Sequence, residues 1–177
     1  VGAIILTHAH EDHIGAIPFF LRELNVPIYG TGFTLEILKE KLKEHRLLDR
    51  ADLRKVAPGQ STELGPFTVE YIRVNHSTIE GVGLAIDTPE GLIVHSGDFR
   101  IDQTPVDGQP TDLNRFAHHG ERGVLLLLSD STNAEKEGYT ISEREIRKTL
   151  ETLFESAKGR VIVATFASNI SRIQQVI

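Results

Sequence analysis

The feature that most constrains this chain is the run His8–His13, which holds three histidines and two acids. It follows the apolar run Ala3–Leu6 after one residue, Thr7, and that run is typical of a short buried strand. The helix-like stretch Ile14–Leu24 comes next. The cluster therefore lies where a strand ends and the chain turns into a helix.

Imidazole and carboxylate groups are common ligands of divalent metal ions. His8 and His10 are two residues apart, and extended backbone places such side chains on the same side. They can therefore bind one ion, while Asp12 and His13 on the following turn can reach a second, adjacent ion. A lone loop histidine is usually only solvated, but surface composition does not easily produce four such groups at H-x-H-x-D-H spacing. We therefore predict a metal site.

The H-x-H-x-D-H spacing resembles the signature of the metallo-β-lactamase superfamily of dinuclear metallohydrolases. Val74–Ser77 matches the segment with the superfamily's lone histidine, and His95–Phe99 matches the segment with its bridging aspartate. The resemblance implies two divalent ions, with zinc favoured and manganese also possible. The implied metal ligands are His8, His10 and His76 for one ion, Asp12 and His13 for the other, and Asp98 shared by both.

Two later segments resemble the β-CASP nuclease branch, and the ribonuclease J family within it. Leu128–Glu135 looks like the acidic motif that opens this branch, and Phe166–Gln175 is similar to the helix start that follows. The resemblance implies catalytic roles for Asp12, Asp98 and Asp130, with Asp130 acting beside the metal ligands. The alternative for Asp130 is a strand-end residue whose carboxylate caps a turn.

Partners that orient the imidazoles are expected at Glu11, Asp130 or nearby backbone carbonyls, because a ligating imidazole is usually held through its other nitrogen. Free N–H groups at a helix start favour anions, although N-capping alone explains Ser168 equally well. The candidates for RNA phosphate contacts are Ser129, Ser131, Ser168 and Asn169. The histidines assigned to structural roles are His45, His95, His118 and His119.

The apolar patterns predict an α/β fold. By the resemblance, residues 1–128 form a partial metallo-β-lactamase αββα sandwich, and residues 129–177 form the start of an α/β β-CASP domain. Strands are expected over Pro27–Gly30, Leu53–Ala57, Phe67–Val74, Val82–Asp87, Leu92–Val94, Val124–Leu128 (buried) and Val161–Thr165. Helices are expected over Ile14–Leu24, Thr31–His45, Ser142–Ala157 (with a Ser142/Glu145 capping box) and 168–177.

Composition is that of an ordinary globular protein, with 40% hydrophobic and 25% charged residues. The absence of cysteine excludes disulfides and thiolate ligands, and it fits a reducing cytoplasm. No apolar run approaches the ~20 residues of a membrane helix, so no membrane partner is expected. A net charge of −6 counts mildly against nucleic acid, whose binders are more often basic.

We expect the sequence to be part of a longer chain, because a strand and a metal loop follow Val1 almost at once. In the superfamily, further strands precede the metal motif, and a further histidine completes the second metal site. Neither has a counterpart before Ile177. We therefore expect a nearly complete first metal site and a weakened second one. The family resemblance also implies a homo-oligomer for the full-length protein.

Three functions remain open. The favoured one is a metal-dependent ribonuclease that hydrolyses single-stranded RNA, as a 5′→3′ exonuclease and an endonuclease. The second is a small-molecule metallohydrolase of the same fold, acting on a lactone, thioester or β-lactam. The third is a non-catalytic partner domain, which six intact ligand residues disfavour. The ligands alone indicate a metallohydrolase, whereas the RNA substrate rests on the resemblance.

Overall fold

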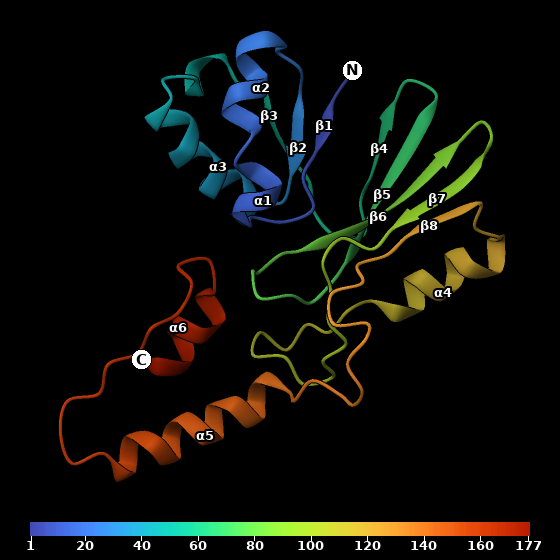
Figure 1. The fold of residues 1–177 in the computed structure, drawn as a ribbon. Helices are drawn as coiled ribbons and strands as arrows, with labels where there is room; N and C mark the ends of the chain where they lie inside the picture. Colours follow the sequence, from blue (N-terminus) through green and yellow to red (C-terminus); the bar gives the residue numbers. More distant parts are fainter.

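The computed structural model describes residues 1–177 as two sheets with helices on their outer sides, followed by two further helices (Figure 1). The elements are β1 (Ile4–Ile5), α1 (Glu11–Ile14), α2 (Ile17–Glu23), β2 (Ile28–Gly30), α3 (Gly32–Glu44), η1 (Leu48–Arg50), β3 (Leu53–Lys55), β4 (Ser61–Leu64), β5 (Phe67–Arg73), β6 (Val82–Thr88), β7 (Gly91–His95), α4 (Leu113–Arg122), β8 (Leu126–Leu128), α5 (Glu143–Ser156) and α6 (Ile170–Val176). None of the helices is both long enough and apolar enough to cross a membrane.

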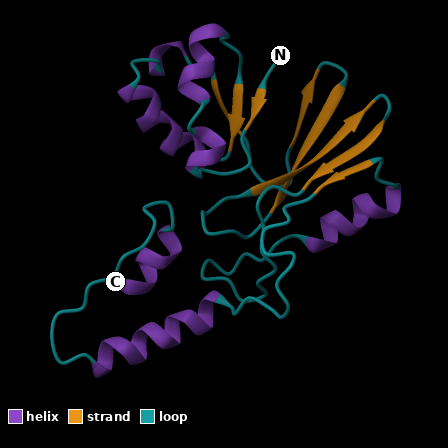
Figure 2. Ribbon diagram, in the orientation of Figure 1, coloured by secondary structure: helices purple, strands orange, loops and turns teal.

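The first sheet consists of the parallel strands β1, β2 and β3, in that order, and α1 to α3 lie on its outer side (Figure 2). Leu35, Leu38 and Leu42 form an apolar stripe along α3, and all three are buried. They pack with Ile14 and Leu21 of α1 and α2 in the outer core. Full burial of one such side chain stabilises the fold by about 1.5–3 kcal/mol.

The second sheet has the order β4-β5-β6-β7-β8 and is antiparallel except for the parallel pair β7–β8. The strands predicted over Val82–Asp87 and Leu92–Val94 are present as β6 and β7, which pair antiparallel as a hairpin. Tyr29 of the first sheet packs with Tyr71 and Leu84 of the second, which places one core between the sheets. Phe116 of α4 packs on a third cluster at the outer face of the second sheet. The layers α–β–β–α confirm the predicted sandwich.

The predicted helix over Ile14–Leu24 is instead two helices, α1 and α2. Pro18 has no N–H to donate to the carbonyl of Ile14, which disfavours a continuous helix, whereas the first turn of α2 accommodates proline readily. The first helix begins at Glu11, earlier than expected, and ends at Ile14. Asp12 and His13 therefore lie on a helix rather than on a turn.

The run Val124–Leu128 contains the predicted strand, β8, but the prediction that it is buried is wrong. Leu125 and Leu127 are 64% and 62% exposed. The strand lies at the edge of its sheet, pairs only with β7, and has no neighbour on its other side within residues 1–177. The apolar run indicates side chains that are favoured in a buried position, but no segment within residues 1–177 buries most of them.

Residues 129–177 contain α5 and α6, which lie apart from both sheets (Figure 1). The predicted strand over Val161–Thr165 is not formed, because no other strand pairs with it, and Ile162 is 86% exposed. Ser142 caps α5 as expected, but its hydroxyl accepts the N–H of Arg144 rather than closing a capping box with Glu145. The predicted domain boundary after residue 128 stays a prediction.

Candidate metal centre

Loops that follow three strands bring the predicted ligands together at one end of the sandwich. His8 and His10 follow β1, His76 follows β5, and Asp98 follows β7. The loop after β1 is tied to the second sheet, because the N–H of Val82, at the start of β6, donates to the carbonyl of Thr7 at 2.9 Å. His8 and Asp98, far apart in the sequence, thus come to within 3.7 Å of each other, from Nε2 to Oδ2.

Four of these side chains offer ligand atoms that all lie within 4.8 Å of one another: His8, His10, His76 and Asp98. Nδ1 of His10 is 3.0 Å from Nε2 of His8 and 3.1 Å from Nε2 of His76. Oδ2 of Asp98 is 3.7 Å from both Nε2 atoms. Tetrahedral zinc with bonds of about 2.0 Å holds its ligand atoms roughly 3.3 Å apart, so these separations fit one ion.

The buried imidazole of His8 and the partly buried imidazole of His76 favour their neutral form. Burial, reinforced by the neighbouring histidines, lowers the pKa of His8 to about 3. Burial also lowers the pKa of His76. A neutral imidazole keeps a lone pair for a metal ion, and protonation removes it. The cluster is therefore ready for metal at neutral pH.

Hydroxyl groups hold the imidazole nitrogens that face away from the cluster. Oγ1 of Thr7 is 3.1 Å from Nδ1 of His8, and Oγ of Ser77 is 3.0 Å from Nε2 of His10. The predicted partner Glu11 is instead paired with Lys41 at 2.7 Å. Sequence reasoning missed the hydroxyls, although Thr7 and Ser77 are direct neighbours of His8 and His76.

Asp98 also faces the residues expected at a second metal. Its Oδ2 points to the three-histidine cluster, while its Oδ1 is 3.5 Å from Nε2 of His13. Nε2 of His13 lies 3.6 Å from Oδ2 of Asp12, whose side chain is 79% exposed. The Asp98 carboxylate therefore lies between the three-histidine cluster and the more exposed pair Asp12 and His13.

Residues 1–120 match the family model of the beta-lactamase superfamily domain. The chain belongs to this superfamily. Among curated proteins it is 50% identical to Ribonuclease J of Helicobacter pylori strain J99 over all of this chain and 26% of that protein. It is 48% identical to Ribonuclease J of Mycolicibacterium smegmatis over all of this chain and 32% of that protein. The chain thus spans about a quarter to a third of the length of these relatives. Their similarity confirms the predicted resemblance to the ribonuclease J family.

Solved structures agree on the fold of this superfamily member. A protein of unknown function from Enterococcus faecalis V583 superposes with a TM-score of 0.71 at 20% identity, covering 98% of this chain and 44% of that one. Zn(2+)-bound PqqB from Methylobacterium extorquens superposes with a TM-score of 0.51 at 16% identity, covering 78% of this chain and 48% of that one. At these identities the likeness shows the shared fold.

Asp130 lines the same cleft as His10, His76 and Asp98, but it forms no hydrogen bond to the ligand imidazoles. Its carboxylate accepts the N–H of Thr132 at 2.8 Å and that of Phe99 at 3.4 Å, and its own N–H donates to Oγ of Ser96 at 2.9 Å. Burial alone raises the pKa of Asp130, but these N–H donors outweigh it and lower the pKa. The carboxylate therefore fastens the loop that carries Asp98.

The predicted phosphate contacts lie at different distances from the cluster. Ser129 lines a small pocket together with His13 and Asp98. Asn169 lines a cavity of about 440 Å³ that also contacts His76, and its side chain caps α6. Ser131 and Ser168 accept hydrogen bonds through their backbone carbonyls, from the N–H groups of Ala134 and Ile170.

A cleft of about 650 Å³ opens over the cluster. The side chains that line it include His10, His76, Asp98, Arg100, Asp130 and Lys136. Its charges are mixed, with two cations beside the acids. The histidines assigned to structural roles lie outside the metal cluster: His45 contacts Arg22, His95 accepts the N–H of Gly97, and His119 is buried against Glu70.

Proposed function

We propose that the chain is the metal-binding catalytic part of a ribonuclease that hydrolyses phosphodiester bonds of single-stranded RNA. The observation that carries this proposal is the placement of Asp98, with one oxygen toward three histidines and the other toward His13. The identity of about 50% to Ribonuclease J over the whole chain supports the RNA substrate. The sandwich alone also fits a small-molecule hydrolase.

The proposed ligands fit two divalent ions, zinc most of all and manganese as an alternative. His8, His10 and His76 would hold the first ion, Asp12 and His13 would hold the second, and Asp98 would serve both. When bound, such a pair lowers the pKa of water and stabilises the charge of an in-line displacement at phosphorus. The exposure of Asp12 and the small number of groups around His13 make the second position the weaker one.

The chain's own residues contribute orientation. Thr7 and Ser77 fix the ring orientations of His8 and His10. The proposed role of the Asp12 carboxylate, beside metal binding, is to orient the attacking water. Asp130 keeps the loop of Asp98 in place.

RNA contacts are proposed at the cleft and at the start of α6, through Ser129, Ser131, Ser168 and Asn169. Residues 129–177 are proposed to begin the β-CASP domain that would cover the cleft. We further propose 5′→3′ exonuclease and endonuclease modes, a cytoplasmic location and a homo-oligomer of the complete protein, each by analogy with the ribonuclease J family.

The deciding experiment is cleavage of a 5′-monophosphorylated single-stranded RNA by the complete protein with zinc or manganese. A His76→Ala variant is the control, because it removes one nitrogen of the cluster and leaves the cleft open. Processive loss of nucleotides that disappears in the variant supports the proposal. Metal-dependent hydrolysis of a lactone or thioester without RNA cleavage supports the small-molecule function instead.

A further inference from the structure

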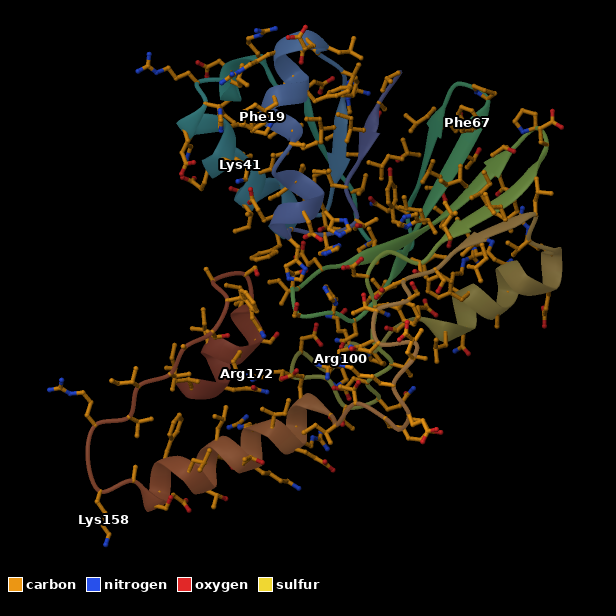
Figure 3. All side chains as sticks on the ribbon, in the orientation of Figure 1. Phe19, Lys41, Phe67, Arg100, Lys158 and Arg172 are labelled. Carbon is orange, nitrogen blue, oxygen red and sulfur yellow. The ribbon has the colours of Figure 1, made fainter.

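A half-buried carboxylate joins the metal loop to the C-terminal helices. Glu143, with a side chain only 13% exposed, accepts a hydrogen bond from Nη1 of Arg100 at 2.5 Å. Its other oxygen accepts one from Nη2 of Arg172 at 3.1 Å. Arg100 comes two residues after Asp98, and Arg172 belongs to α6. Figure 3 labels both arginines at this junction.

The backbone around Arg100 is fastened at the same junction. Asp102 accepts the N–H of Glu143 and that of Thr104, each at 2.9 Å. The N–H of Arg100 donates to the carbonyl of Asn75 at 2.7 Å. Because Asn75 precedes His76, the segment after Asp98 is linked both to the His76 loop and to the start of α5.

The two sides of the junction line two different spaces. Arg100 lines the cleft of about 650 Å³ together with His10, His76 and Asp98. Glu143 lines the cavity of about 440 Å³ together with His76 and Asn169. A ligand in the cleft can therefore contact Arg100, and a ligand in the cavity can contact Glu143, the two partners of one ion pair.

We propose that Glu143 is a positioning residue, which holds the carboxylate of Asp98 in place through Arg100 and couples it to α6 through Arg172. Without the carboxylate, two guanidinium groups would face each other at a half-buried place, and the loop would shift to separate them. A displacement of about 1 Å at a reacting centre can cost ~100-fold in rate. The inference rests on the proposed metal centre, and its catalytic readout rests also on the proposed RNA substrate.

The test compares Glu143→Gln with Glu145→Gln in the complete protein. Both changes remove one negative charge from the first turn of α5, but Glu145 is exposed and contacts neither arginine. The cap of Ser142 and the N–H of Glu143 do not need the Glu143 carboxylate, so α5 keeps its start. Two quantities are measured: the zinc affinity of each position by chelator competition, and kcat and KM for RNA.

We expect Glu143→Gln to weaken the second, weaker zinc position about tenfold or more, with a smaller change at the first. We expect kcat to fall about tenfold with KM changed less than about threefold. Glu145→Gln leaves all these values unchanged. Since Glu143 acts through Arg100, combining Glu143→Gln with Arg100→Gln should be little worse than the poorer single variant, and Arg100→Lys should retain most activity.

Equal zinc affinities and rates for Glu143→Gln and Glu145→Gln overturn the proposal, as does a double variant whose losses multiply. If the wild-type protein cleaves no RNA, the proposed function fails, and the zinc affinities alone then decide the role of Glu143. If Glu143→Gln does not fold, the contrast between Arg100→Lys and Arg100→Gln replaces it, and equal values for these two variants contradict the proposal.

Discussion

Replacing Thr7 by valine tests whether the first metal position depends on a hydroxyl that sequence reasoning missed. The change keeps the shape of the side chain and removes the group 3.1 Å from Nδ1 of His8. A metal ion on Nε2 forces the proton onto Nδ1, where it needs an acceptor. His8 is only 1% exposed, so water cannot readily replace Thr7.

The expected loss follows from the free energy of that one hydrogen bond. A buried donor left without a partner costs about 1–3 kcal/mol. The metal-free variant avoids part of this cost, because His8 can move its proton to Nε2 and donate to Nδ1 of His10, 3.0 Å away. A difference of ~1.4 kcal/mol corresponds to a factor of about ten, so we expect zinc to bind roughly tenfold more weakly.

The assay is competition for zinc with a chromogenic chelator at neutral pH. Thr7→Ser keeps the hydroxyl and should stay within about threefold of wild type. Thr62→Val is the matched control. Thr62 accepts a hydrogen bond from the Tyr71 hydroxyl, with 3.1 Å between the two oxygens, and it is not part of the metal cluster. Unchanged zinc affinity in Thr7→Val, or an equal loss in Thr62→Val, would refute the orienting role of Thr7.

Three further predictions concern stability and the second metal position. Leu38→Ala, at a fully buried position of the outer core, should lower the free energy of unfolding by about 2–5 kcal/mol, measured by urea denaturation. Burial lowers the pKa of His119 below its ordinary 6.5 despite its contact with Glu70. Its contribution to stability is therefore present above about pH 6.5 and is lost as the pH falls, so the unfolding free energy of His119→Gln should depend less on pH in this range. Asp98→Asn should abolish zinc binding at the second position, counted by metal analysis, and retention of two ions would contradict the shared role of Asp98.

The local part of the site was predictable because its information lies in short spacings. His8 and His10 leave an extended backbone on one side, and the structure places Nε2 of the first and Nδ1 of the second 3.0 Å apart. The position of His76 came from resemblance alone, since nothing in its own neighbourhood marks it as a ligand. The structure brings its Nε2 to within 3.1 Å of His10.

The failures of the sequence patterns share a physical cause. The apolar runs Val124–Leu128 and Val161–Thr165 both predict strands, but a strand forms only where another strand offers hydrogen bonds. Residues 126–128 pair with β7 and form β8, whereas Val161–Thr165 pairs with no strand within residues 1–177. Periodicity reports what a segment needs to bury or pair, and only the fold decides whether the partner is present.

The Ser77 hydroxyl and the Glu143 junction were hidden for a different reason. Their roles depend on contacts between segments far apart in sequence, Ser77 with His10 and Arg100 with Glu143, and the residue types involved are common on surfaces. The exposed pair Arg147–Glu151 on the same helix has equally suitable residues and lies away from the site. Burial separates the two cases, because solvent screens the exposed pair to a contribution of about 0.3–0.5 kcal/mol, whereas the Glu143 carboxylate is mostly shielded from water. The position of Asp98 therefore depends on α5 and α6, which the metal motif does not include.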